Sequence, residues 1–199
     1  LYLLPDAVAG LQAMKSVLQP EGIIRVNLHS SLQRANFFRA QNLFKFMGLM
    51  DDNPEDMEIG IVRETMNALK DGVSLKAQTW SPKYNEDEGI ILANQLLVGD
   101  RGATIPEFFS LLKAANLEFI NMVHWRQWDL MRLFKEPDDL PAFLGMNLPE
   151  LSVEDKLNLF ELFHPVHRLL DLWCGNSNQA KSFVPVKEWA DSDWGTAKV

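Results

Sequence analysis

The sequence predicts an α/β protein, and the order of its helices and apolar strands carries this prediction. Residues 4–30 read as an amphipathic helix, a tight turn and a short β-branched strand. Residues 104–125 read as a second helix that leads into an apolar strand, and residues 168–173 as a last apolar strand. A helix followed by a short apolar strand is typical of the second half of a β-α-β unit. We therefore expect a sheet that is parallel at residues 22–30, with an antiparallel pair of strands formed by 117–125 and 168–173.

The first helix and strand follow from local spacing. Apolar side chains recur three or four residues apart, as on one helix face, at Val8, Leu11, Met14 and Leu18. Pro5 suits the first helical turn, where its missing N–H is not needed. The run at residues 19–22 (QPEG) ends the helix, because proline interrupts it and glycine allows the turn. Residues 23–28 then form the strand, which ends at His29 and Ser30.

The middle of the chain is expected to be helical. Residues 31–47 carry apolar side chains along one side, and residues 52–56 (DNPED) combine a cap, a proline and first-turn acids before a helix over 54–70. Residues 73–87 are expected to be a loop, and an aromatic loop of this kind is often functional. Trp80 and Tyr84 are its candidate functional residues, although a surface loop that buries one tryptophan explains them equally well.

The C-terminal part begins with a strong helix start at residues 104–107 (TIPE). Asn116 is expected to end that helix in a left-handed conformation, and residues 117–125 follow as a strand. Residues 126–134 form an amphipathic stretch, and the two prolines within residues 137–141 end it. Ser152 is the expected cap of a helix that runs to residue 163. Residues 176–199 are expected to be a linker or tail.

Composition restricts the kind of protein. The 199 residues are 47% hydrophobic, with a net charge of −8 and a pI near 5.0. This charge argues against non-specific binding to nucleic acid or to an anionic membrane. The single cysteine, Cys174, excludes an internal disulfide and fits a reducing, cytoplasmic location. No apolar run reaches the roughly 20 residues that a membrane-spanning helix needs.

The order of these segments resembles the class I S-adenosylmethionine-dependent methyltransferases. The resemblance rests on a leucine-rich LPD turn at residues 4–6, EGIIRVNLHS at 21–30, TIPE at 104–107 and LFHPVHRLLDLWC at 162–174. The histidine pair that is common before such a turn is missing, and Asn116 stands where glycine is usual. The resemblance covers residues 1–175.

The resemblance implies a partial Rossmann-like methyltransferase sheet of strands 5, 6 and 7, with a helical cap inserted at about residues 31–98. The chain is then the C-terminal, acceptor-side half of the domain, within a longer protein. Its function is S-adenosylmethionine-dependent methyl transfer to an unidentified acceptor. The alternative is a methyltransferase-like module that serves interaction or assembly without catalysis.

The implied cofactor is S-adenosyl-L-methionine, but its main binding motif is not in this sequence. The family uses an acidic, glycine-rich loop, and the chain contains no G-x-G. Most cofactor contacts are therefore expected upstream of Leu1. Only the first turn carries over to the methionine side of the site, where Tyr2 and Leu3 are the candidate cofactor-binding residues.

Candidate residues for the chemistry lie near the end of the first strand. Methyl transfer depends mainly on positioning, with a general base for some acceptors. His29 is the candidate base, and a hydrogen-bonded structural histidine is the alternative. Arg34 and Gln41 follow the strand's C-terminal end and are expected to face the ligand crevice of an open α/β sheet. Trp128 is a further pocket candidate, or a core or dimer contact.

No metal site is expected, because His164 and His167 are separated by a proline and Cys174 has no C-x-x-C partner. The strand edge at residues 22–30 would be left unpaired in this half of a sheet. We therefore expect it to bind the missing N-terminal half or a second copy of the chain. A glycine-rich loop upstream of Leu1 would favour the enzyme over the interaction module.

Overall fold

A four-stranded mixed sheet forms the centre of the protein. The computed structural model describes residues 1–135 and 140–177. The strand order is β2-β1-β4-β3, with β1 at Ile23–Ser30, β2 at Gly102–Ala103, β3 at Leu117–Met122 and β4 at Leu169–Asn176. Strand β1 is parallel to β2 and antiparallel to β4, and β3 is antiparallel to β4. The predicted α/β class and the antiparallel pairing of the last two long strands are therefore confirmed.

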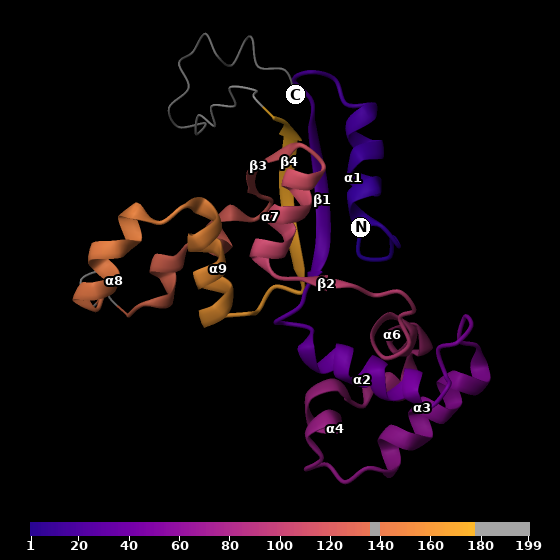
Figure 1. The fold of residues 1–199 in the computed structure, drawn as a ribbon. Coiled ribbons are helices and arrows are strands. Elements are labelled where there is room, and N and C mark those ends of the chain that lie inside the picture. The colour runs from indigo at the N-terminus through magenta and orange to yellow at the C-terminus, as the bar shows by residue number, and fades with distance from the viewer. Residues whose placement is uncertain (136–139, 178–199) are drawn as a thin grey trace, which may run out of the picture.

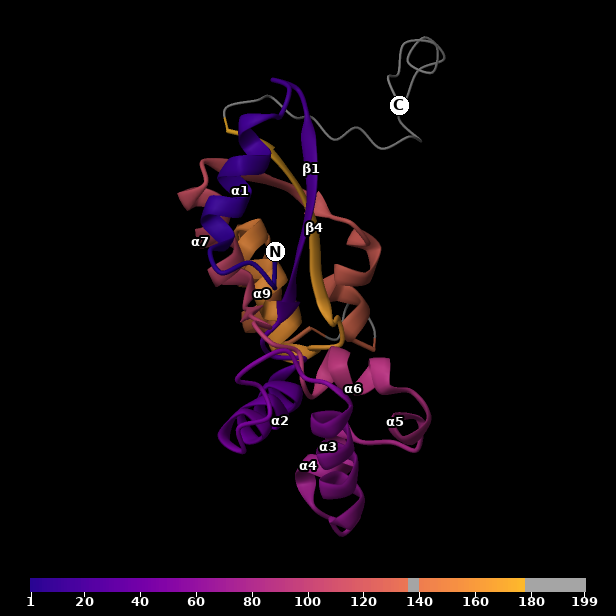
Figure 2. The ribbon, with the colours of Figure 1, turned by 90° about the vertical axis from the view of Figure 1, so that its right-hand side faces the viewer.

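Helices α1 (Ala7–Ser16), α7 (Ile105–Ala114) and α9 (Val153–Phe163) lie on one side of the sheet (Figure 2). Asp6 caps α1 by accepting a hydrogen bond from the Ala9 N–H, so Pro5 precedes the cap and does not lie in the first turn as predicted. These helices and the strands share one hydrophobic core. Its fully buried members include Leu11, Phe108, Leu112, Leu170 and Leu172.

A separate helical lobe (residues 35–94) lies at the end of the sheet where β1 ends (Figure 1). It consists of α2 (Ala35–Phe46), α3 (Asp56–Ala68), α4 (Ser74–Thr79), α5 (Lys83–Glu86) and α6 (Glu88–Asn94). The lobe has its own hydrophobic core, which includes Phe44, Val62, Met66 and Ile91. It occupies most of the stretch that the sequence predicted as an inserted cap.

The prediction of a loop at residues 73–87 is wrong in part, because α4 and α5 form there. Both helices are too short for a period of 3.6 residues to be recognised in the sequence. Tertiary packing stabilises them: Trp80 and Tyr84 stack with ring centroids 4.8 Å apart and pack on the lobe core.

The segment after β3 also differs from the prediction. The strand ends at Met122, after a register shift between Phe119 and Asn121, and Trp125 begins the 3₁₀-helix η1 (Trp125–Trp128). A second 3₁₀-helix, η2 (Leu130–Leu133), follows because the Asp129 carboxylate accepts a hydrogen bond from the Met131 N–H. The amphipathic residues 126–134 thus form two short turns that bury Trp128 and Leu130.

The chain reaches α9 through the short helix α8 (Ala142–Asn147) and the 3₁₀-helix η4 (Leu148–Glu150). Asn116 has φ of 57°, the left-handed conformation predicted for it. Ser152 caps α9 as expected, by accepting a hydrogen bond from the Asp155 N–H. Most of the predicted interruption at 137–141 and nearly all of the predicted tail lie outside the described residues. Within residues 1–135 and 140–177, no helix is long and apolar enough to cross a bilayer.

Candidate functional site at the junction of sheet and lobe

Three segments that are distant in sequence meet where β1 ends. Strand β1 finishes with His29 and Ser30, which are both buried, and the chain then turns into α2. The turn at residues 99–102 leads from the lobe into β2, which pairs with β1 at these same residues. Gly99 has φ of +77°, a conformation that favours glycine. The turn brings Asp100 against the end of β1 and the start of α2.

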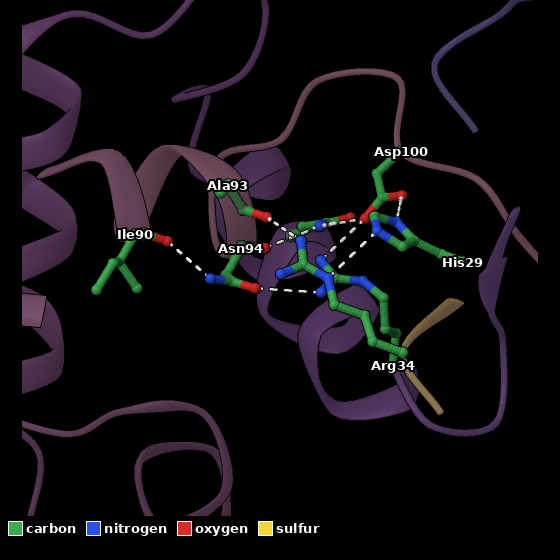
Figure 3. A network of polar contacts seen from close by, with 8 residues as sticks. His29, Arg34, Ile90, Ala93, Asn94 and Asp100 are labelled. Carbon is green, nitrogen blue, oxygen red and sulfur yellow. Dashed lines mark hydrogen bonds and ion pairs between the residues drawn. The ribbon is translucent and has the colours of Figure 1, made fainter. Parts of the chain in front are cut away.

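Asp100 is the centre of a buried polar network (Figure 3). Its Oδ1 accepts a hydrogen bond from His29 Nδ1 at 2.5 Å, and its Oδ2 accepts from Arg34 Nη2 at 3.1 Å and from Gln41 Nε2 at 3.0 Å. Burial raises the pKa of Asp100, but the hydrogen bonds from His29 and Gln41 and the charge of Arg34 outweigh it. The pKa therefore lies below its usual range, and Asp100 is an ionised carboxylate.

On the lobe side the network continues through Asn94 at the end of α6. Asn94 Oδ1 accepts from Arg34 Nη1 at 3.1 Å, and its backbone oxygen accepts from Gln41 Nε2 at 2.8 Å. Its side-chain amide donates to the Ile90 carbonyl oxygen at 2.9 Å (Figure 3). The Arg34 guanidinium also lies 5.0 Å from the centroid of the Phe37 ring. Helices α2 and α6 are thus joined to each other and to the turn at 99–102.

On the sheet side both ring nitrogens of His29 have partners. Nδ1 donates to Asp100, because an ionised carboxylate can only accept. Arg168, just before β4, donates from Nε to His29 Nε2 at 3.3 Å and from Nη2 to the Ala93 carbonyl oxygen at 3.4 Å. Since arginine can only donate, Nε2 is the acceptor of the Arg168 hydrogen bond. His29 is 1% exposed. This arrangement favours the structural alternative, and a role as general base stays a prediction.

The N-terminal segment (residues 1–6) contacts one face of the His29 ring. Tyr2 stacks on it, with ring centroids 4.0 Å apart and an interplanar angle of 23°. The Tyr2 carbonyl oxygen accepts from the Arg101 N–H at 3.0 Å, and Arg101 Nη1 donates to the Pro5 carbonyl oxygen at 2.6 Å. Leu3 is 51% exposed. Of the two predicted cofactor-side residues, Tyr2 therefore lies next to the network, whereas Leu3 is open to solvent.

A second buried acid lies beside the end of β1. Glu161 on α9 accepts from the Ser30 hydroxyl through Oε1 at 2.5 Å, and Ser30 Oγ accepts from the Gln33 N–H at 3.0 Å. Glu161 is 2% exposed, and its Oε2 has no hydrogen-bond partner among the described residues. Burial raises the pKa of Glu161, and hydrogen bonds from the Ser30 hydroxyl and the Ile105 N–H offset this rise only in part.

The structure brings some of the predicted site residues together and separates others. His29, Arg34 and Gln41 share the network, where all three are buried. Tyr84 lies in the lobe core within the electrostatic influence of Arg34, and burial raises its pKa. Trp128 belongs to the sheet core, with its ring 4.6 Å from His167 and 5.3 Å from Phe160. Whether any of the predicted pocket residues touches an acceptor stays a prediction.

The sequence did not single out the network residues Asn94, Asp100 and Arg168, nor Glu161. The only local signal for Asp100 is an acidic residue inside the turn at 99–102 that contains two glycines. No group of three or more potential ligands is arranged for a metal ion in the part of the chain that the structure describes.

The fold is shared with a known methyltransferase. The chain is similar to PKMT2 from Rickettsia typhi, with a TM-score of 0.59 and 13% identity over 89% of this chain and 34% of that one. A structure of the same protein in complex with AdoHcy (S-adenosylhomocysteine) gives a TM-score of 0.57 and 11% identity over the same shares. The chain therefore spans about a third of the length of this methyltransferase. No protein-family model and no curated protein sequence matches it.

Proposed function

We propose that this chain is the acceptor-side part of an S-adenosylmethionine-dependent methyltransferase. The observation that carries the proposal is the sheet, in which antiparallel β4 lies between β1 and β3, in a fold similar to a methyltransferase solved with AdoHcy. We equate β1, β3 and β4 with strands 5, 6 and 7 of the class I sheet. The helical lobe is then the cap that covers the acceptor side of the crevice.

The reaction places a limited demand on this part of the protein. The acceptor's lone pair attacks the methyl carbon, the S–CH₃ bond breaks, and its electron pair stays on sulfur to give S-adenosylhomocysteine. An acceptor proton passes to a base or to water. The rate depends mainly on in-line alignment of acceptor and methyl group and on exclusion of water. In this proposal Tyr2 and Leu3 lie on the cofactor side of the crevice. The helical lobe forms its wall on the acceptor side.

Arg34 and Gln41 support this wall from inside in the proposal. Both side chains are buried, with 1% and 7% exposure. Their hydrogen bonds to Asp100 and Asn94 hold α2 and α6 in place at the end of β1. Their contribution is therefore to the position of the lobe.

The proposal includes a partner for the open edge of β1. Among the described residues, β2 pairs only with His29 and Ser30, so residues 23–28 have no strand on the side opposite β4. A pocket at this edge is lined by apolar residues that include Leu4, Val8, Leu28 and Leu111. We propose that a parallel strand from the upstream half of the methyltransferase pairs here, since unpaired apolar edges favour association.

Calorimetric titration with S-adenosylmethionine tests this division of function. We expect saturable binding to the full-length protein and none to residues 1–199 alone, because most cofactor contacts lie upstream in this proposal. Tight binding by residues 1–199 would contradict the division into halves. Absence of binding by the full-length protein would contradict the proposed cofactor.

A non-catalytic methyltransferase-like module is the second candidate. The observation in its favour is that His29, the expected base, is buried and bonded at both ring nitrogens. An acidic, glycine-rich loop upstream of Leu1, together with transfer of a labelled methyl group by the full-length protein, would support the enzyme. Lack of both would support the module.

A further inference from the structure

The turn at residues 99–102 holds two parts of the protein at the same time. Asp100 accepts hydrogen bonds from Gln41 of the lobe and from Arg34, the residue just before α2. The next residue, Arg101, bonds the N-terminal segment through its backbone N–H to Tyr2 and through its guanidinium to Pro5. The lobe and the segment are therefore attached to neighbouring residues of one turn.

The His29 ring forms a second connection between the same two parts. One ring nitrogen donates to Asp100, and one ring face stacks on Tyr2. A side chain with both nitrogens bonded and 1% exposure has little freedom to rotate. Its orientation, and with it the surface on which Tyr2 rests, is therefore fixed by Asp100.

The turn at residues 99–102 is packed closely against its neighbours, so a displacement of the lobe also displaces the turn. A Cβ added at Gly102 would lie 2.6 Å from Ser31 Oγ and 2.7 Å from the Phe38 ring. Gly102 and Ala103 also pair with the last two residues of β1. Phe38 lies on α2, so the turn is packed directly against the lobe as well as bonded to it.

We propose that Asp100 is a positioning residue that couples the helical lobe to the N-terminal segment and thereby fixes Tyr2. The inference rests on the proposed function, in which Tyr2 lies on the cofactor side and the lobe on the acceptor side. A displacement of α2 then moves the Asp100 carboxylate, the His29 ring and Tyr2 together. Acceptor binding at the lobe and cofactor binding near Tyr2 are consequently coupled, and each changes the affinity of the other by the same factor.

Two substitutions in the full-length protein separate the two connections. Asp100→Asn keeps an oxygen for His29 but turns an NH₂ group toward the donors of Arg34 and Gln41, so it weakens the lobe connection. His29→Asn keeps a short donor toward Asp100 but removes the ring on which Tyr2 stacks. Asp171→Asn is the matched control, because Asp171 also pairs with an arginine, Arg25 at 2.5 Å, but on the sheet away from this junction.

Hydrogen exchange of backbone amides is the main measurement. In Asp100→Asn we expect faster exchange in both α2 and the N-terminal segment, with β3 and β4 unchanged. In His29→Asn we expect faster exchange in the N-terminal segment only, and in Asp171→Asn in neither. The ¹⁵N spectrum of the imidazole adds a second readout: His29 carries its proton on Nδ1 in the wild type, and the Nδ1 resonance shifts in Asp100→Asn because a neutral amide oxygen accepts more weakly than a carboxylate.

Calorimetry with S-adenosylhomocysteine gives the functional readout. The loss of hydrogen bonds in Asp100→Asn, or of one ring stack in His29→Asn, predicts about fivefold weaker binding, and Asp171→Asn should bind like the wild type. The inference is overturned if Asp100→Asn speeds exchange in α2 alone, or if His29→Asn leaves the N-terminal segment as in the wild type. If Asp100→Asn does not fold, His29→Asn and the wild-type imidazole spectrum decide. If the wild type does not bind the probe, the proposed function fails, and the exchange data still decide whether the coupling exists.

Discussion

Glu161 is a buried acid whose ionisation opposes folding. It has one hydrogen-bonded oxygen and no countercharge among its described partners, and burial raises its pKa. The folded state therefore holds a proton that the unfolded state releases. Stability contributed by this group is complete at low pH, and it is lost from about pH 4.3, the ordinary value for glutamate, up to the raised pKa of the folded state.

Glu161→Gln should remove this loss, because glutamine stays neutral and its oxygen accepts the same bonds. We expect the free energy of unfolding of the variant to be within about 1 kcal/mol of wild type at low pH and to rise relative to wild type as pH increases. Urea denaturation at several pH values measures the difference. Glu64→Gln, at an exposed site on α3, is the control. Its difference in unfolding free energy from wild type should not change with pH. A difference that does not change with pH for Glu161→Gln would contradict the raised pKa of Glu161.

At the scale of single elements, α7 depends on its first turn. Thr104 and Glu107 form a capping box, in which Glu107 Oε2 accepts from the Thr104 N–H at 2.7 Å and Thr104 Oγ1 accepts from the Glu107 N–H at 3.4 Å. Helix α7 carries Phe108 and Leu112 into the sheet core and packs against α1 and α9. Weaker capping of α7 therefore lowers the stability of the sheet and of the helices packed on it.

Thr104→Ala should lower the free energy of unfolding by about 1 kcal/mol. The physical reason is the loss of the hydroxyl that satisfies a first-turn N–H. Thr104→Ser keeps this hydroxyl and should recover most of the stability. Urea denaturation of the three proteins under one buffer condition gives the comparison. Equal destabilisation by serine and alanine would show that the methyl group, and not the cap, is responsible.

At the scale of the whole molecule, the open edge of β1 is the main difference from a closed domain. Residues 23–28 pair on one side only within the described parts of the chain. Exposed, unpaired edges favour pairing with another chain, and a lysine at such an edge opposes it. Ile23, at the start of the strand, is 55% exposed and is the natural position for such a lysine.

Residues 1–199 alone should self-associate in a concentration-dependent way, and Ile23→Lys should shift them toward monomer. Phe46→Lys changes an even more exposed apolar residue, 90% exposed on the lobe, and should leave the association unchanged. Sedimentation velocity over a range of concentrations is the measurement. A monomer at every concentration would contradict the proposed role of the edge.

Local sequence predicted the elements whose causes are local. The β-branched run gives β1, Thr104 and Glu107 give the start of α7, and Asn116 gives its left-handed end, because these depend on residues a few positions apart. The same reasoning failed for α4 and α5, which are too short to show a period. It also failed for residues 123–125, which were predicted as the end of a strand but lie beyond β3, where the chain turns into η1.

The candidate site was predicted in part. His29, Arg34 and Gln41 were singled out because they follow the end of a strand, and they do meet there. The sequence by itself determined the α/β class, the order of most elements and the residues at the end of β1. Only the tertiary structure decided that Asp100 joins them and that Glu161 faces Ser30. Those partners are 71 and 131 positions apart, and side-chain hydrogen bonds over such separations leave no periodic or local pattern in a sequence.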